Sequence, residues 1–284
     1  MHLILNKLYH CKTKLLKMKK FYFLVCLTIS LFSCAQEKSK TKKERQDAII
    51  KEHLEDCAQN YNYTINMAEW QECLDNGLKK DSTIAYLWQQ KAMPLFKARK
   101  YEAGMIFLDK AVKYDRKSWL PYRAFIKCIF SKTYKEAIVD FEEAKKIFGN
   151  TYEMDHTYDF YIALSYLQLN DFKKAEEIFK RNFDEIKKTQ GEDCFHHLDL
   201  FYFGIAKYEQ QKLEEAIVIF DKALEKYPEF SDVEMYKGIC LYKLGQKEKG
   251  EALIEKARED LKKGYTINED NVIYERYPYQ IKNK

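Results

Sequence analysis

A motif of two helices returns along this chain at a spacing of about 34 residues, and this spacing constrains the fold more than any other feature. The clearest copy runs from Phe203 to Pro228, and a second runs from Tyr236 to Ala257. Each copy has a small residue at one point of each helix. In the first helix these residues are Ala58, Ala92, Ala163, Gly204 and Gly238, and in the second they are Gly104, Ala137, Ala175, Ala216 and Gly250. Small side chains let two helices cross closely, so the motif predicts stacked helical hairpins.

A large apolar residue follows four positions after the second small residue, on the same helical face. These core positions are Leu108, Phe141, Phe179, Phe220 and Ile254. Together the two patterns resemble the tetratricopeptide repeat family over residues 47–264. The resemblance implies an all-α, right-handed α-solenoid of about six helix-turn-helix repeats. The repeats are expected to start near Lys51, Ala85, Trp119, His156, His197 and Ser231. Trp70 occupies a small-residue position in the first unit, which is therefore expected to be an atypical N-terminal cap.

The N-terminal region has the pattern of an export signal. Residues 18–33 combine a basic start, an apolar run and small residues near the exit. The apolar run is short for a hydrocarbon layer of about 30 Å, which disfavours a permanent transmembrane helix. Leu31, Ser33 and Cys34 resemble the lipobox of bacterial lipoproteins, which implies that Cys34 becomes the lipidated N-terminus. Ordinary signal cleavage after Ala35 is the alternative.

This leader sets the expected organisation of the chain. Residues 1–17 are an upstream extension, residues 34–46 a polar tether, residues 47–264 the solenoid and residues 265–284 a tail. The expected location is the bacterial cell envelope, as an outer-membrane lipoprotein on either face of that membrane.

The charge of the mature chain argues against nucleic-acid binding. The full sequence has 49 Lys and Arg against 44 Asp and Glu, a net charge of +5. Residues 1–33 hold six lysines and no acidic residue, so their removal leaves 43 − 44 = −1. A near-neutral protein lacks the basic surface that nucleic acids require.

The sequence offers little catalytic chemistry. It has no GxxxxGK[ST], GxGxxG or HExxH motif. Cys194, His196, His197 and Asp199 form one cluster of zinc-type donors, but adjacent histidines point to different sides of a helix or strand. We therefore expect no metal, no cofactor and no enzymatic activity, with a metal-dependent enzyme as the weakest alternative. Cys57 and Cys73 fall on the two helices of one hairpin, where a disulfide is possible but is not readable from sequence.

The resemblance also implies where a partner would bind. In such repeats the first helices line a concave groove, and here that face is rich in tyrosine, which suits recognition surfaces. The predicted peptide-binding residues are Tyr86, Gln90, Arg123, Lys127, Phe160, Tyr161, Phe201, Tyr202, Ile205, Tyr208, Met235, Tyr236 and Tyr242. The alternative is that these aromatic residues pack between repeats, or beneath the tyrosine-rich tail.

The sequence thus predicts an exported, lipid-anchored solenoid that binds a protein or peptide at the cell envelope. An outer-membrane assembly lipoprotein and a glycan-uptake accessory lipoprotein remain as alternatives.

Overall fold

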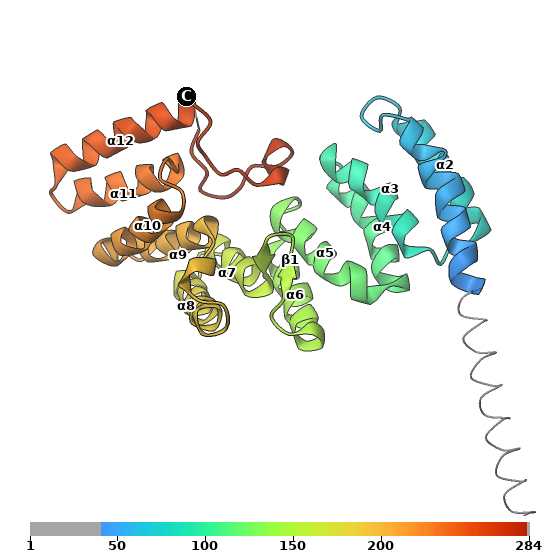
Figure 1. Ribbon diagram of the computed structural model, residues 1–284, viewed down its shortest axis with the longest axis horizontal. Helices are drawn as coiled ribbons and strands as arrows, with labels where there is room; N and C mark the ends of the chain where they lie inside the picture. The colour runs from blue at the N-terminus through green and yellow to red at the C-terminus, as the bar shows by residue number, and fades with distance from the viewer. Residues whose placement is uncertain (1–40, 283–284) are drawn as a thin grey trace, which may run out of the picture. The chain divides into compact units, whose positions relative to one another are not determined.

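The computed structural model describes residues 41–282, in two compact units that divide between Ile84 and Ala85 (Figure 1). The signal segment and Cys34 lie outside the described residues, so the interpretations of them stay predictions. No helix in the described part of the chain is long and apolar enough to cross a membrane.

The first unit holds one irregular hairpin. Residues 41–50 are helical and continue into a π-helical turn, η1 (Lys51–Glu55), followed by a short 3-10 turn, η2 (Ala58–Asn60). The second helix of the hairpin is α2 (Met67–Lys80). Helical structure therefore includes residues 41–46, which the sequence assigned to a polar tether.

A disulfide links the two halves of this first hairpin. It joins Cys57 to Cys73, whose Cα atoms are 5.8 Å apart. The sequence alone left this disulfide undecided. Trp70 is buried and meets the edge of the Tyr63 ring at a centroid distance of 5.5 Å. A bulky indole at a small-residue position and a broken first helix make this hairpin atypical, as expected.

The second unit contains five regular hairpins, in which each helix packs on the next one along the chain. The first helices are α3 (Ala85–Lys97), α5 (Arg116–Ile129), α7 (Tyr158–Gln168), α9 (His197–Glu209) and α11 (Ser231–Lys243). The second helices are α4 (Tyr101–Tyr114), α6 (Tyr134–Phe148), α8 (Phe172–Thr189), α10 (Leu213–Lys226) and α12 (Lys247–Lys262). Consecutive packing of such hairpins gives the predicted right-handed α-solenoid, which the structure confirms.

Close helix crossings occur where the repeat pattern places small residues. A Cβ atom added at Gly204 would lie 2.5 Å from Cδ1 of Phe220 and would clash with this fully buried ring. At the last crossing two glycines face each other, and a Cβ at Gly250 would lie 2.7 Å from the carbonyl oxygen of Gly238. These contacts explain why a small residue recurs in both helices of the motif.

Two inter-repeat linkers are longer than the others and have structure of their own. The linker before α7 forms a small antiparallel hairpin of β1 (Tyr152–Glu153) and β2 (His156–Thr157). The linker before α9 contains a 3-10 turn, η3 (Glu192–Cys194). Both linkers deliver histidines to the starts of neighbouring first helices.

The C-terminal tail does not continue the array. After α12 the chain turns back as an irregular loop that contains a 3-10 turn, η4 (Asp270–Ile273), drawn in red in Figure 1. A backbone hydrogen bond anchors the start of this loop: the Ser231 amide donates to the carbonyl of Tyr265 at 3.0 Å.

Candidate functional site

The tail forms a closed loop because a single carboxylate holds both of its ends. Asp232, fully buried near the start of α11, accepts hydrogen bonds from the amide of Ile267 at 3.1 Å and the amide of Ile281 at 2.7 Å. It also accepts from the Thr266 hydroxyl at 2.7 Å. Burial raises the pKa of Asp232, and these three donors oppose that rise. We call residues 265–281 the tail loop.

The returning part of the tail loop lies against α9 and α11. The Tyr202 hydroxyl on α9 donates to the carbonyl of Pro278 at 2.9 Å. Tyr279 meets the ring of Tyr236 on α11 at a centroid distance of 6.1 Å, and Tyr277 is buried. These contacts place a non-helical segment, with a turn at Pro278 and Tyr279, on the first helices, where the sequence predicted a bound peptide.

The tip of the tail loop reaches the turns of the first two hairpins in the second unit. The guanidinium of Arg99, after α3, donates to the carbonyl of Tyr274 at 3.1 Å. Arg99 and Lys132, after α5, lie 3.4 and 3.2 Å from the carboxylate of Glu275. Both basic residues adopt the left-handed backbone conformation of their turns, with φ of 58°. Arg99 and Lys132 thus hold the tip of the tail loop through the carboxylate of Glu275.

Five of the predicted groove residues are fully buried while the tail loop is docked. Each has a relative exposure of zero, namely Phe160, Tyr161, Phe201, Tyr202 and Ile205. The prediction assumed that one face of every first helix is open, but nearly every side chain of α7 and α9 is buried. Their second helices, neighbouring repeats and the tail loop surround both helices, so these residues pack as the alternative interpretation described.

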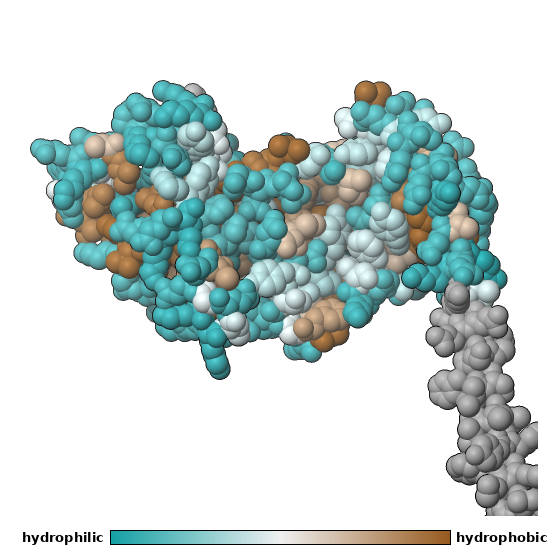
Figure 2. All heavy atoms as spheres, viewed as in Figure 1, coloured by the Kyte–Doolittle hydropathy of each residue, from teal (hydrophilic) through white to brown (hydrophobic). Residues whose placement is uncertain are grey.

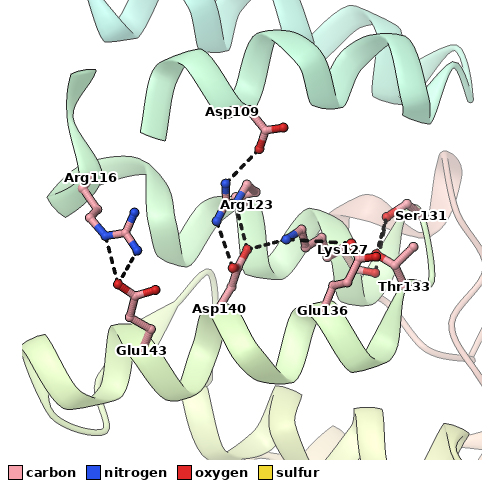
Figure 3. Close-up of polar contacts among 9 residues, drawn as sticks. All are labelled: Asp109, Arg116, Arg123, Lys127, Ser131, Thr133, Glu136, Asp140 and Glu143. Carbon is pink, nitrogen blue, oxygen red and sulfur yellow. Dashed lines mark hydrogen bonds and ion pairs between the residues drawn. The ribbon is translucent and has the colours of Figure 1, made fainter. Parts of the chain in front are cut away.

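The two basic groove residues are already paired inside the solenoid. Arg123 makes a two-pronged contact with Asp140, at 2.7 and 2.9 Å, and reaches Asp109 at 2.8 Å (Figure 3). Lys127 approaches the same Asp140 at 2.8 Å. Because α5 and α6 share this buried carboxylate, both cations stabilise the hairpin and are poorly placed to attract an acidic ligand.

The remaining predicted residues keep some exposure. Tyr86 stacks on Trp119 at 6.2 Å with an interplanar angle of 11°, and the side chain of Gln90 donates to Gln89. Tyr208 meets Tyr236 edge-on at 5.4 Å, next to the tail loop. Met235 is half-buried and Tyr242 is exposed. Figure 2 shows the visible face as mostly hydrophilic with scattered apolar patches.

A cluster of histidines and carboxylates lies where the two structured linkers meet the tail loop. His156 Nδ1 lies 2.5 Å from the Asp199 carboxylate, and its Nε2 lies 3.4 Å from Oε1 of Glu269 in the tail loop. Burial alone lowers the pKa of His156, but Asp199 and Glu269 raise it to about 9. The perpendicular ring of His196 is 4.8 Å away, and burial and the charge of His156 lower its pKa to about 4.

Only half of this cluster was predicted from the sequence. The prediction grouped His196 and Asp199 with Cys194 and His197, which are local neighbours. The structure leaves Cys194 exposed and pairs His197 with Asn268 at 3.2 Å. The true partners come from distant segments, since His156 and Asp199 are 43 positions apart, and no spacing signal connects them.

Comparisons with known proteins agree with the fold. Residues 207–264 match the tetratricopeptide repeat family model. Similar solved structures include a tetratricopeptide repeat protein from Parabacteroides merdae ATCC 43184, with 14% identity, coverage of 81% of this chain and 96% of that chain, and a TM-score of 0.57. PilW, a widely conserved type IV pilus biogenesis factor, has 14% identity, 76% and 92% coverage, and a TM-score of 0.56.

A third similar structure is MamA from Desulfovibrio magneticus RS-1, with 14% identity, 63% and 96% coverage, and a TM-score of 0.53. No curated protein sequence matches this chain. At these identities the likeness shows a shared solenoid fold alone.

Proposed function

We propose that this protein is an exported, lipid-anchored tetratricopeptide-type scaffold that holds an extended protein or peptide segment at the bacterial cell envelope. The observation that carries the proposal is the tail loop itself. The first helices already hold a non-helical segment of the chain, and many of the contacts that hold it are made to its backbone atoms. Tyr202 and Arg99 donate to tail carbonyls, and Asp232 accepts from tail amides.

Contacts to backbone atoms do not depend on the side chains of the bound segment. A non-helical segment from another protein can therefore satisfy the same donors and acceptors when it takes the place of the tail loop. The aromatic surface beside the tail loop, at Tyr208 and Tyr236, supplies apolar area for such a segment. In this proposal the tail loop competes with the partner, and the groove is free only when the loop is released.

The test is site-specific photocrosslinking in cells that express the full chain. A photoreactive residue at Tyr236 lies beside the tail loop, and one at Val139, exposed on α6, serves as the control position. We expect a crosslinked partner at Tyr236 whose yield rises when Glu275→Ala removes the ion pairs of the tail with Arg99 and Lys132, and no such product at Val139. Equal products at both positions would refute binding in the groove.

Export and lipid anchoring are proposed from the leader and from Cys34. The disulfide between Cys57 and Cys73 supports export, because such bonds persist in oxidising compartments. Intact-mass analysis of the wild type and Cys34→Ser tests the anchor: we expect a diacylglyceryl adduct that the variant lacks. A mature wild-type chain that begins at Gln36 without lipid would refute it.

A further inference from the structure

The cluster at the edge of the tail loop has the donor types and spacing of a metal site. Ligand atoms of His156, His196 and Glu269 all lie within 4.8 Å of one another. Two of these residues come from the structured linkers before α7 and α9, and the third comes from the tail loop. Imidazole nitrogens and a carboxylate oxygen are the donors that zinc prefers.

His156 is the best-prepared ligand of the three. Its side chain is fully buried, and its Nε2 atom has no hydrogen-bond partner in the described structure. That nitrogen faces Oε1 of Glu269 at 3.4 Å. In a tetrahedral zinc site with bonds of about 2.0–2.1 Å, two ligand atoms are separated by roughly 3.3 Å. The observed pair therefore already has the separation that two ligands of one zinc ion require.

Asp199 occupies the position of an outer carboxylate. It lies 2.5 Å from Nδ1 of His156, on the opposite side of the ring from Glu269. A carboxylate behind a histidine fixes the ring tautomer and presents the other nitrogen to a metal. The ring of His156 is further held by stacking on Phe160, with centroids 4.0 Å apart. The ligand is thus oriented before any ion arrives.

His196 supplies the adaptable third donor. The ligand atoms of the three residues lie within 4.8 Å of one another, a wider spacing than zinc requires, so the His196 ring has to turn towards the other two ligands to complete the site. The side chain keeps 34% of its exposure, which leaves room for that turn and admits water as a fourth ligand. His197, although adjacent in sequence, is engaged with Asn268 and takes no part.

We propose that His156, His196 and Glu269 bind one zinc ion, with water as the fourth ligand, and that the ion fastens the tail loop to the solenoid. Only Glu269 comes from the tail loop, so the ion adds a metal bridge to the hydrogen bonds, ion pairs and packing that already join the tail loop to the solenoid. The proposal concerns how the tail is attached, and it stands independently of any partner that binds in the groove. Its rival is a metal-free ion pair of His156 with the two carboxylates.

The experiment uses the full-length chain in detergent, purified without a histidine tag and stripped with EDTA. Zn²⁺ is titrated by calorimetry and the bound metal is counted by native mass spectrometry, with Mg²⁺ as the comparison ion. We expect one Zn²⁺ per chain and no Mg²⁺. Glu269→Gln and His196→Ala should each weaken Zn²⁺ binding at least tenfold, and Asp199→Asn should weaken it about 10–100-fold. The matched control His197→Ala should retain wild-type affinity.

A second readout tests the fastening of the tail. At a Zn²⁺ concentration 100 times the dissociation constant, amides of the tail loop should exchange hydrogen up to roughly 100-fold more slowly than in EDTA. Glu269→Gln should abolish that difference. Absence of stoichiometric Zn²⁺ binding, or binding that Glu269→Gln and His196→Ala leave intact, would overturn the site. Binding with no change in tail exchange would overturn the fastening.

Discussion

Replacement of Asp232 by alanine should release the tail loop while the solenoid stays folded. The carboxylate accepts three hydrogen bonds, from Thr266, Ile267 and Ile281, and Ile267 is only 2% exposed. A hydrogen bond to a charged group contributes about 1.5–3 kcal/mol, and a donor left buried without a partner adds a penalty of its own. Water can reach part of the vacated site, so we expect the docked tail to lose roughly 3 kcal/mol.

That loss corresponds to an increase of about 100-fold in the population of the released tail, since 1.4 kcal/mol is a factor of ten. Hydrogen exchange with mass spectrometry should therefore show tail amides exchanging about 100-fold faster, while amides of α10 keep their protection. Asp232→Asn keeps one acceptor oxygen and should have a smaller effect. Asp270→Asn removes an exposed charge from the same segment and should change nothing. Unaltered tail exchange in Asp232→Ala would refute the reasoning.

Three further predictions address packing, acid stability and the disulfide. Gly204→Ala should destabilise the protein by about 1–2 kcal/mol through overpacking against Phe220, and Phe220→Leu should relieve that cost. If the two substitutions change the free energy of unfolding in urea additively in the double mutant, the close contact between Gly204 and Phe220 would be contradicted. Although burial raises the pKa of Glu176, its lysine partners lower it to about 2. The ionised carboxylate of Glu176 therefore stabilises the fold above pH 4.5, and this stabilisation is lost as the pH falls towards 2. Glu176→Gln should weaken the pH dependence of the melting temperature in this acid range. Reduction of the Cys57–Cys73 disulfide should destabilise residues 41–84 by about 3 kcal/mol, measured as faster hydrogen exchange there.

The fold was largely predictable because it repeats. A periodic small residue specifies a helix crossing by itself, and the helices α3, α9 and α11 begin at the predicted residues Ala85, His197 and Ser231. Two other starts were displaced, since α5 begins at Arg116 instead of Trp119, and α7, which follows the β1–β2 hairpin, begins at Tyr158 instead of His156. Repeat periodicity carries no information on segments that leave the repeat.

The candidate site was harder to predict for the same reason. Tyr202 was predicted to line an open groove, but its hydroxyl donates to Pro278, in a tail 76 residues further along the chain. Likewise, the pairing of His156 with Glu269 joins a linker to the tail. Such contacts are set by three-dimensional placement, and no local pattern in the sequence encodes them.

The tail loop also changes how this solenoid should fold. In a simple array each repeat touches only its neighbours, so contact order is low and the ends can unravel separately. Here Arg99 bonds to Tyr274, 175 positions away, and so ties the first hairpin of the second unit to the segment that follows the last. Such a bond slows folding through its loop-closure entropy, but it couples distant repeats into one cooperative transition. Residues 85–282 should therefore unfold with the sharp transition of a globular domain.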